Sequence, residues 1–155
     1  MLKISKKLST TLSLALSVFF FICCIAGLFF LPVLTESLLE IPVKGGETVL
    51  PAEKALSLVC AYGIVLDLIL ADLFLFVLLL HVRKGQVFTE RAVAMIRGVS
   101  WCCMGLCVPL AYLGTIFRLS LIVCFLAMFL GLSLRVCKNA FEEATAIKQE
   151  NDLTV

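Results

Sequence analysis

ALSLVCAYGIVLDLILADLFLFVLLL, residues 55–80, decides the fold of this chain, because it is a continuous apolar run with only two charged side chains, Asp67 and Asp72. A helix needs about 20 apolar residues to cross the roughly 30 Å hydrocarbon core of a bilayer. The run exceeds that length. It therefore predicts a membrane-spanning helix.

Three further apolar runs have a comparable length and cover residues 8–34, 98–117 and 119–136. The 155-residue chain is 62% hydrophobic and 15% charged, with a mean hydropathy of +1.13, far from the composition of a soluble domain. It lacks the alternating pattern of an outer-membrane barrel. We predict an all-α integral membrane protein, a four-helix bundle that forms one membrane domain over residues 1–155.

The first run needs to be distinguished from a cleaved signal peptide, since Lys3, Lys6 and Lys7 precede it. Its apolar part is longer than the 7–15 residues of a signal peptide, and no small-x-small cleavage site follows at the right place. We interpret it as a retained membrane anchor.

Lysine and arginine in the short loops predict the orientation, because such residues stay on the cytoplasmic side. The N-terminus, the second loop and the segment after the last span are basic, whereas the first loop mixes two lysines with four glutamates. Both termini are therefore expected in the cytoplasm. The net charge of +2 is explained by topology, so no direct binding of nucleic acid is expected. The basic residues are Lys3, Lys6, Lys7, Arg83, Lys84, Arg91, Arg97, Arg135 and Lys138.

The second loop predicts the start of a helix in the membrane interface. Thr89 is a good N-cap, Glu90 follows in the first turn, and apolar residues then recur at helical spacing. Phe88 precedes the cap and is placed to pack back on the first turns. Trp101 fits the aromatic belt at a membrane surface.

The tail VCKNAFEEATAIKQE, residues 136–150, contains strong helix formers and neither glycine nor proline. We predict that the last helix extends into the cytoplasm over this tail, with a stripe of Phe141, Ala144 and Ile147 covered by Val93 and Ile96. Asn151 and Asp152 would end the helix. The exposed side chains would be Glu142, Glu143, Lys148 and Glu150. A frayed tail is the alternative.

Two stretches carry a resemblance to a known family: KGQVFTERAVAMIRGVSWCC, residues 84–103, and AIKQENDLTV, residues 146–155. They resemble domain-of-unknown-function family 2975, small bacterial membrane proteins with four helices. One departure is Ala92, where the family usually has asparagine. The resemblance implies a location in the bacterial cytoplasmic membrane. It also implies a partner, because members are often encoded beside a small Cro-type helix-turn-helix regulator, and it implies no biochemical activity.

We predict that the second loop and the tail form one docking surface for such a regulator. Its candidate residues are Phe88, Arg91, Arg97, Phe141, Glu142, Glu143, Asn151, Asp152 and Leu153.

Charged residues in or beside the spans are functional candidates, because burial of a charge in hydrocarbon is costly. Asp67 and Asp72 lie about 140° apart on a helix, so they cannot form one two-carboxylate site. For Asp72, Arg135, Ser17 and Ser133 are possible partners, and Asp67 has none that is evident. Polar contacts between helices, a proton- or ion-linked site and ligand sensing all remain open. The intramembrane polar candidates are Asp67, Asp72, Arg118 and Arg135.

The eight cysteines invite a metal or redox interpretation, and Cys103 and Cys107 share a helix face. There is no C-x-x-C motif, however, and cysteine is a frequent buried hydrophobe, so we favour packing over thiol sensing or a metal site. We expect no metal and no cofactor.

Pro109 predicts a kink near Gly105. Ala127 and Gly131 form a small-xxx-small patch that lets another helix approach closely.

No serine or cysteine is paired with a histidine and a carboxylate, and no glycine-rich loop could hold phosphate, so we expect no enzyme. Two functions remain. The first is a non-enzymatic membrane protein that presents a cytoplasmic surface to a helix-turn-helix regulator, in signalling or sequestration. The second is a small transporter or channel subunit that works as a homo-oligomer, with the buried acids on its permeation path.

Overall fold

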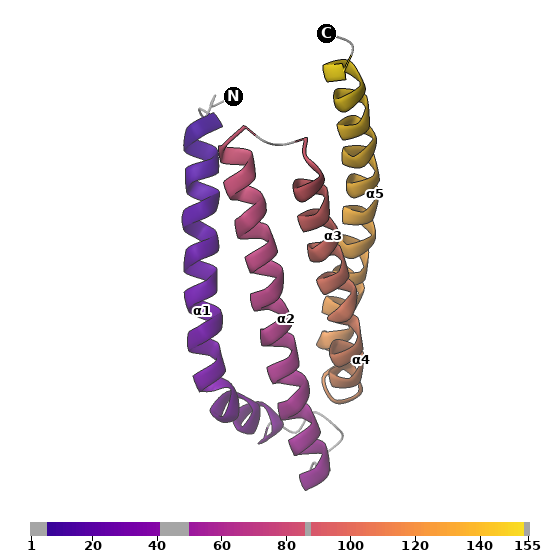
Figure 1. Cartoon of the computed structure of the whole chain (residues 1–155). Helices are drawn as coiled ribbons and strands as arrows, with labels where there is room; N and C mark the ends of the chain where they lie inside the picture. Colours follow the sequence, from indigo (N-terminus) through magenta and orange to yellow (C-terminus); the bar gives the residue numbers. More distant parts are fainter. Residues whose placement is uncertain (1–5, 41–49, 86–87, 154–155) are drawn as a thin grey trace, which may run out of the picture.

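The computed structural model describes residues 6–40, 50–85 and 88–153, and within these ranges the regular structure is entirely helical. Figure 1 shows the helices running side by side along one long axis. They are α1 (Lys6–Glu40), α2 (Pro51–Arg83), α3 (Glu90–Gly105), α4 (Cys107–Ile116) and α5 (Leu119–Leu153).

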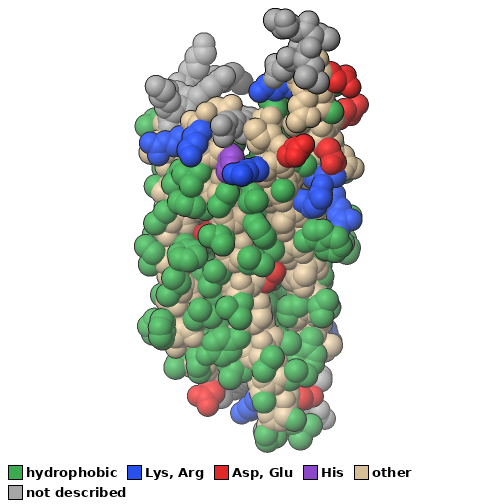
Figure 2. Space-filling view, viewed as in Figure 1, with side chains coloured by type: hydrophobic (Ala, Val, Ile, Leu, Met, Phe, Trp, Pro, Cys, Tyr) green, Lys and Arg blue, Asp and Glu red, His purple; other side chains and the backbone are tan. Residues whose placement is uncertain are grey.

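Four of the described helical stretches are long and apolar enough to cross a membrane, with α3 and α4 together forming one of them. This confirms the four predicted spans as helices, although each helix continues beyond its apolar run. Hydrophobic side chains cover the middle of the molecule, and charged side chains gather toward its two ends (Figure 2). The chain is therefore a multi-pass membrane protein by the length and composition of its helices.

The helices contact one another in a row. Among the described residues α1 packs only against α2, α2 also packs against α3 and α4, and α5 packs against α3 and α4. The helices α1 and α5 stand at opposite sides of the molecule (Figure 1). The arrangement does not close into the ring of contacts that a regular four-helix bundle has.

The centre of the row is α3, which is covered by α2 on one side and by α5 on the other. Its buried positions recur at helical spacing and combine apolar with small polar side chains. Most large apolar side chains of α1 and α5 are instead exposed, as are several of α2, as expected for surfaces that face lipid. The buried residues of α3 are Ala92, Val93, Ile96, Ser100 and Cys102.

Pro109 interrupts the third span, as predicted. The helix α3 ends at Gly105, Leu106 follows, and α4 begins at Cys107. Proline has no N–H to donate to the carbonyl four residues earlier, here that of Gly105, and its ring crowds that group. Leu110 still bonds to Leu106, with 3.1 Å between nitrogen and oxygen, so the helical course resumes at once.

Pro32 was not singled out in the sequence, yet it lies inside α1, and Figure 1 shows that α1 bends before its end. The helix α1 continues past its apolar run to Glu40, and residues 41–49 lie outside the described residues. The start of α1, the α2–α3 connection and the end of α5 lie at one end of the molecule (Figure 1), here called the α2–α3 end.

Candidate functional site

A turn and an N-cap position the start of α3 at the α2–α3 end. Gly85 has a φ of 75°, a left-handed conformation that glycine adopts without steric cost, and it follows the last turn of α2. The Thr89 side chain accepts a hydrogen bond from the backbone N–H of Ala92, with 3.3 Å between oxygen and nitrogen. Thr89 is thus the N-cap that the sequence predicted.

The extension of α5 lies against this start of α3. The rings of Phe88 and Phe141 stack, with centroids 6.0 Å apart and planes inclined by 28°. Val93 of α3 is buried. On α5 the Thr145 side chain is 5% exposed, and its hydroxyl donates to the carbonyl of Phe141 at 2.7 Å. The tail is therefore a packed helix, not a frayed end.

The predicted stripe on α5 is wrong in one position. Ile147 is 54% exposed, and Thr145 takes the buried position instead. Steps of three residues drift by about 60° each around a helix that turns 100° per residue. Two such steps from Phe141 turn Ile147 away from α3, whereas a step of four keeps Thr145 on the same face.

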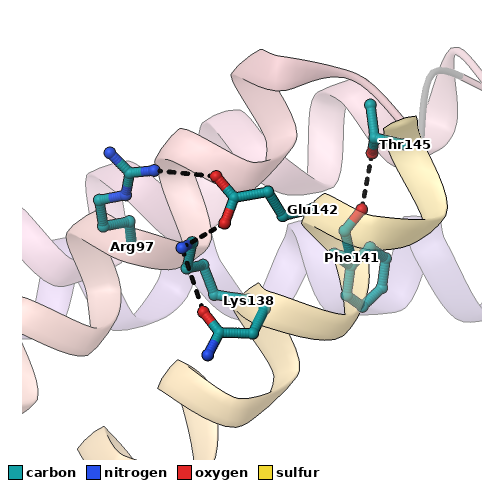
Figure 3. A network of polar contacts seen from close by, with 6 residues as sticks. Arg97, Lys138, Phe141, Glu142 and Thr145 are labelled. Carbon is teal, nitrogen blue, oxygen red and sulfur yellow. Dashed lines mark hydrogen bonds and ion pairs between the residues drawn. The ribbon is translucent and has the colours of Figure 1, made fainter. Parts of the chain in front are cut away.

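Glu142 joins the two helices through ion pairs. Its carboxylate lies 3.5 Å from the Arg97 guanidinium of α3 and also pairs with Lys138, one turn earlier on α5 (Figure 3). The Lys138 ammonium also donates to the side-chain oxygen of Asn139 at 3.1 Å. The hydrogen bond from Lys138, with the charges of Lys138 and Arg97, lowers the pKa of Glu142 below its ordinary value.

A groove of about 320 Å³ runs between α3 and the α5 extension. We call this region the α3–α5 platform. Charged, polar and apolar side chains all line it, so it suits a polar protein surface better than a small apolar ligand. Its residues are Phe88, Glu90, Val93, Arg97, Phe141, Glu142, Thr145, Ala146 and Gln149.

The structure brings four of the predicted docking residues together in the platform: Phe88, Arg97, Phe141 and Glu142. Arg91 and Glu143 are exposed beside them. The helix α5 runs to Leu153, past its predicted end at Asn151 and Asp152, and the side chains of 151–153 lie outside the described residues. Sequence reasoning missed Lys138 as a partner of Glu142, although their four-residue spacing is a usual signal for a helical ion pair.

Asp72 lies in the α1–α2 interface, where it is 6% exposed. The Ser17 hydroxyl of α1 donates to its carboxylate at 2.8 Å. Of the three partners considered from the sequence, Ser17 is the one observed. Arg135 lies instead over the Trp101 ring, 4.4 Å from its centroid, and Ser133 donates to the carbonyl of Phe129 in its own helix.

Asp67 faces a different neighbour. Its carboxylate lies against α3, where one oxygen would be 3.8 Å from a Cβ built on Gly105, and the Cys102 thiol interacts with the same group. The oxygen Oδ2 of Asp67 is buried and, within the described ranges, has no hydrogen-bond partner. The two acids thus face separate helix interfaces, as predicted from their angular spacing. Arg118 is exposed in the turn between α4 and α5.

The cysteines are unbridged, and no three metal-ligating side chains come together in the described part of the chain. Cys107 and Cys124 are neighbours across the α4–α5 interface, where the Cys124 thiol donates to the carbonyl of Cys107 at 3.5 Å. Ser100 fills a similar role between α3 and α5, since its hydroxyl donates to the carbonyl of Gly131 at 2.8 Å. Small polar side chains therefore connect α5 to its neighbours.

No curated protein and no solved structure matches this chain significantly. A family model described as "Protein of unknown function (DUF2975)" matches residues 7–155, which is nearly the entire sequence. The matched region therefore includes both the apolar helices and the α3–α5 platform. The chain belongs to the DUF2975 family of proteins of unknown function.

Proposed function

We propose that this protein is a non-enzymatic component of the bacterial cytoplasmic membrane that presents the α3–α5 platform to a small helix-turn-helix transcriptional regulator. The observation that carries the proposal is the α5 extension. About 17 residues of α5 follow the last apolar run, which at 1.5 Å per residue corresponds to roughly 25 Å of helix. A helix that served only to cross the membrane would not need this length.

The position of the platform supports a cytoplasmic role. The platform lies at the α2–α3 end, where the basic residues of the second loop also lie, and basic loops stay in the cytoplasm. We accordingly place both termini in the cytoplasm. A surface there is accessible to a soluble DNA-binding protein.

Charge complementarity supports a basic partner. Residues 141–150 of the α5 extension contain three glutamates and one lysine, and Glu142 and Glu143 are exposed. DNA-binding domains carry basic surfaces that meet phosphate. An acidic helix can bind such a surface and withhold the regulator from DNA, which describes sequestration at the membrane.

Reconstitution from purified parts tests the proposal. If a Cro-type helix-turn-helix regulator is encoded beside this chain, it is mixed with the full-length protein in detergent, and binding is compared with binding to a variant that lacks residues 151–155 and to Glu142→Gln/Glu143→Gln. Both changes should weaken binding and leave the folded protein intact. Arg118→Gln, at the other end of the molecule, is the matched control and should bind normally. A regulator that binds no form of the protein contradicts the proposal, and a truncated protein that fails to fold identifies the tail as a structural clasp.

The alternative function, a small transporter or channel subunit, is favoured by one observation. The buried oxygen Oδ2 of Asp67, which has no hydrogen-bond partner among the described residues, is the kind of group that a proton- or ion-linked site uses. The alternative has less support, since Asp67 and Asp72 face different interfaces. It predicts that the purified protein forms a homo-oligomer and moves ions across liposome membranes, and that Asp67→Asn abolishes this flux.

A further inference from the structure

A second groove, of about 270 Å³, lies between α3 and α5 closer to the apolar surface than the platform groove. Ser100 lies at its base and is nearly completely buried. Gly131 allows the helices to approach here, because a Cβ on it would lie 3.0 Å from the Met104 side chain. Larger side chains then line the groove on either side, which makes it a built feature of the interface. They are Arg97, Trp101, Arg135, Lys138 and Asn139.

The groove is strongly basic. Arg97, Arg135 and Lys138 contribute three positive charges, and the Glu142 carboxylate forms ion pairs with Arg97 and Lys138. The cluster therefore has a formal net charge of three minus one, or +2. Arg135 stacks on Trp101 through its guanidinium, and its N–H groups are left in position to donate to an anion.

The surroundings of the groove match the boundary of a membrane. Trp101 is 60% exposed, and tryptophan is enriched where hydrocarbon meets headgroups. Leu132 and Val136, within one turn of Arg135 on α5, are exposed apolar side chains. Figure 2 shows Lys and Arg side chains gathered on this flank, with hydrophobic side chains on one side of them and acidic ones on the other.

We propose that this groove binds the phosphate of an anionic phospholipid, with the acyl chains lying along the exposed apolar face of α5. Guanidinium groups bind phosphate oxygens in pairs, and the Lys138 ammonium adds a point charge. The net charge selects phosphatidylglycerol or cardiolipin over zwitterionic lipids, whose ammonium or choline group it repels. Basic pockets between membrane helices bind such headgroups in general.

The single tryptophan of the chain provides the readout, because it lines the groove. The full-length protein is reconstituted in phosphatidylcholine vesicles that contain either brominated phosphatidylglycerol or brominated phosphatidylcholine at the same mole fraction. Bromine quenches tryptophan fluorescence at short range. We expect stronger quenching by the brominated phosphatidylglycerol. Equal quenching by the two lipids overturns the proposal.

Charge variants separate the groove from general surface attraction. Arg135→Gln should lower the preference for phosphatidylglycerol about fivefold, the factor expected for one basic residue at an anionic membrane surface. Lys138→Gln should also lower this preference. It is used in place of Arg135→Gln if that variant does not fold. Glu142→Gln should raise the preference, because it removes the one negative charge. Arg91→Gln has the same charge change outside the groove and should alter nothing.

Two outcomes contradict the inference in distinct ways. If Arg91→Gln lowers the preference as much as Arg135→Gln does, the attraction is a property of the whole surface. If the two brominated lipids quench equally while soluble glycerol phosphate changes the tryptophan fluorescence, the groove binds a free organic phosphate and not a lipid. The regulator-binding experiment does not depend on either result.

Discussion

The ring of Phe88 stacks on the ring of Phe141 with 6.0 Å between their centroids, which joins the residue before α3 to the extension of α5. Both residues lie outside the long apolar runs, so contact with lipid does not fix the conformation of their segments. Their contact, together with the ion pair between Glu142 and Arg97, joins the two sides of the α3–α5 platform.

A double-mutant cycle on this pair should reveal direct coupling. Phe88→Ala and Phe141→Ala should each destabilise the protein, and the double variant should lose less than the sum by about 0.5–1.5 kcal/mol, the coupling of an aromatic pair. The measurement is equilibrium unfolding in detergent micelles. Phe125→Ala, on an exposed part of α5, is the control and should have little effect. Strict additivity of the two changes would mean that the rings do not interact in solution.

The hydrogen bond between Ser17 and Asp72 predicts how α1 is held. Among the described helices α1 contacts only α2, and this bond is a polar interaction that joins the two. Ser17→Ala should destabilise the protein by roughly 0.6–2 kcal/mol, the range for hydrogen bonds between membrane helices. Unfolding titrations in detergent measure this. Ser133→Ala is the matched control, because Ser133 bonds only within its own helix, and a similar loss there would contradict the assignment.

Asp67→Asn should leave expression and unfolding free energy nearly unchanged, within about 0.5–1 kcal/mol. Asparagine has the shape of a neutral carboxyl group, and the site by Gly105 holds one oxygen with no hydrogen-bond partner among the described residues. Expression in membranes and thermal unfolding measure the outcome. Collapse of the folded protein with Asn, together with survival of Asp67→Glu, would show that the charged form is required.

Much of the fold could be predicted from local signals. Apolar length gives the four spanning helices, Thr89 gives the start of α3, and the missing N–H of Pro109 gives the break after Gly105. Each of these effects acts within one or two helical turns. None depends on which helix packs against which.

The neighbours of each helix could not be predicted in the same way. Apolar residues surround most of α1, so its sequence marks no face, and its restriction to α2 could not be foreseen. Arg135 was considered for Asp72, but it stacks on Trp101, since α5 lies beyond α3 and does not reach that acid. A long cationic side chain in a membrane protein can follow several directions, and only the packing selects one.

The lowered pKa of Glu142 predicts an acid-sensitive platform. A carboxyl group whose pKa is lower in the folded state stabilises that state at pH values above its pKa in the unfolded chain, which is roughly 4.3 for glutamate. This stabilisation is lost as the pH falls through the pKa of the folded state. The α5 extension should therefore become more accessible to protease below about pH 4. Limited proteolysis across pH 6 to 3, with the cleavage sites mapped, measures this. Glu142→Gln keeps the fold but removes the ion pairs at every pH, so the protease accessibility of its α5 extension should show no such transition.

Gly131 should tolerate an added side chain less well than Gly27 does. A Cβ on it would lie 3.0 Å from Met104, 3.3 Å from Cys103 and 3.4 Å from the carbonyl of Ser100, so α3 and α5 would have to separate. Gly131→Ala should destabilise the protein by about 1–3 kcal/mol, the usual cost of overpacking. Gly27→Ala is the control, because nothing lies within 4 Å of its added Cβ, and it should be neutral or slightly stabilising. Thermal unfolding of both variants in the same detergent gives the comparison. Equal stability of the two would mean that α3 and α5 do not approach closely at Ser100, and the basic groove above it would then lose its base.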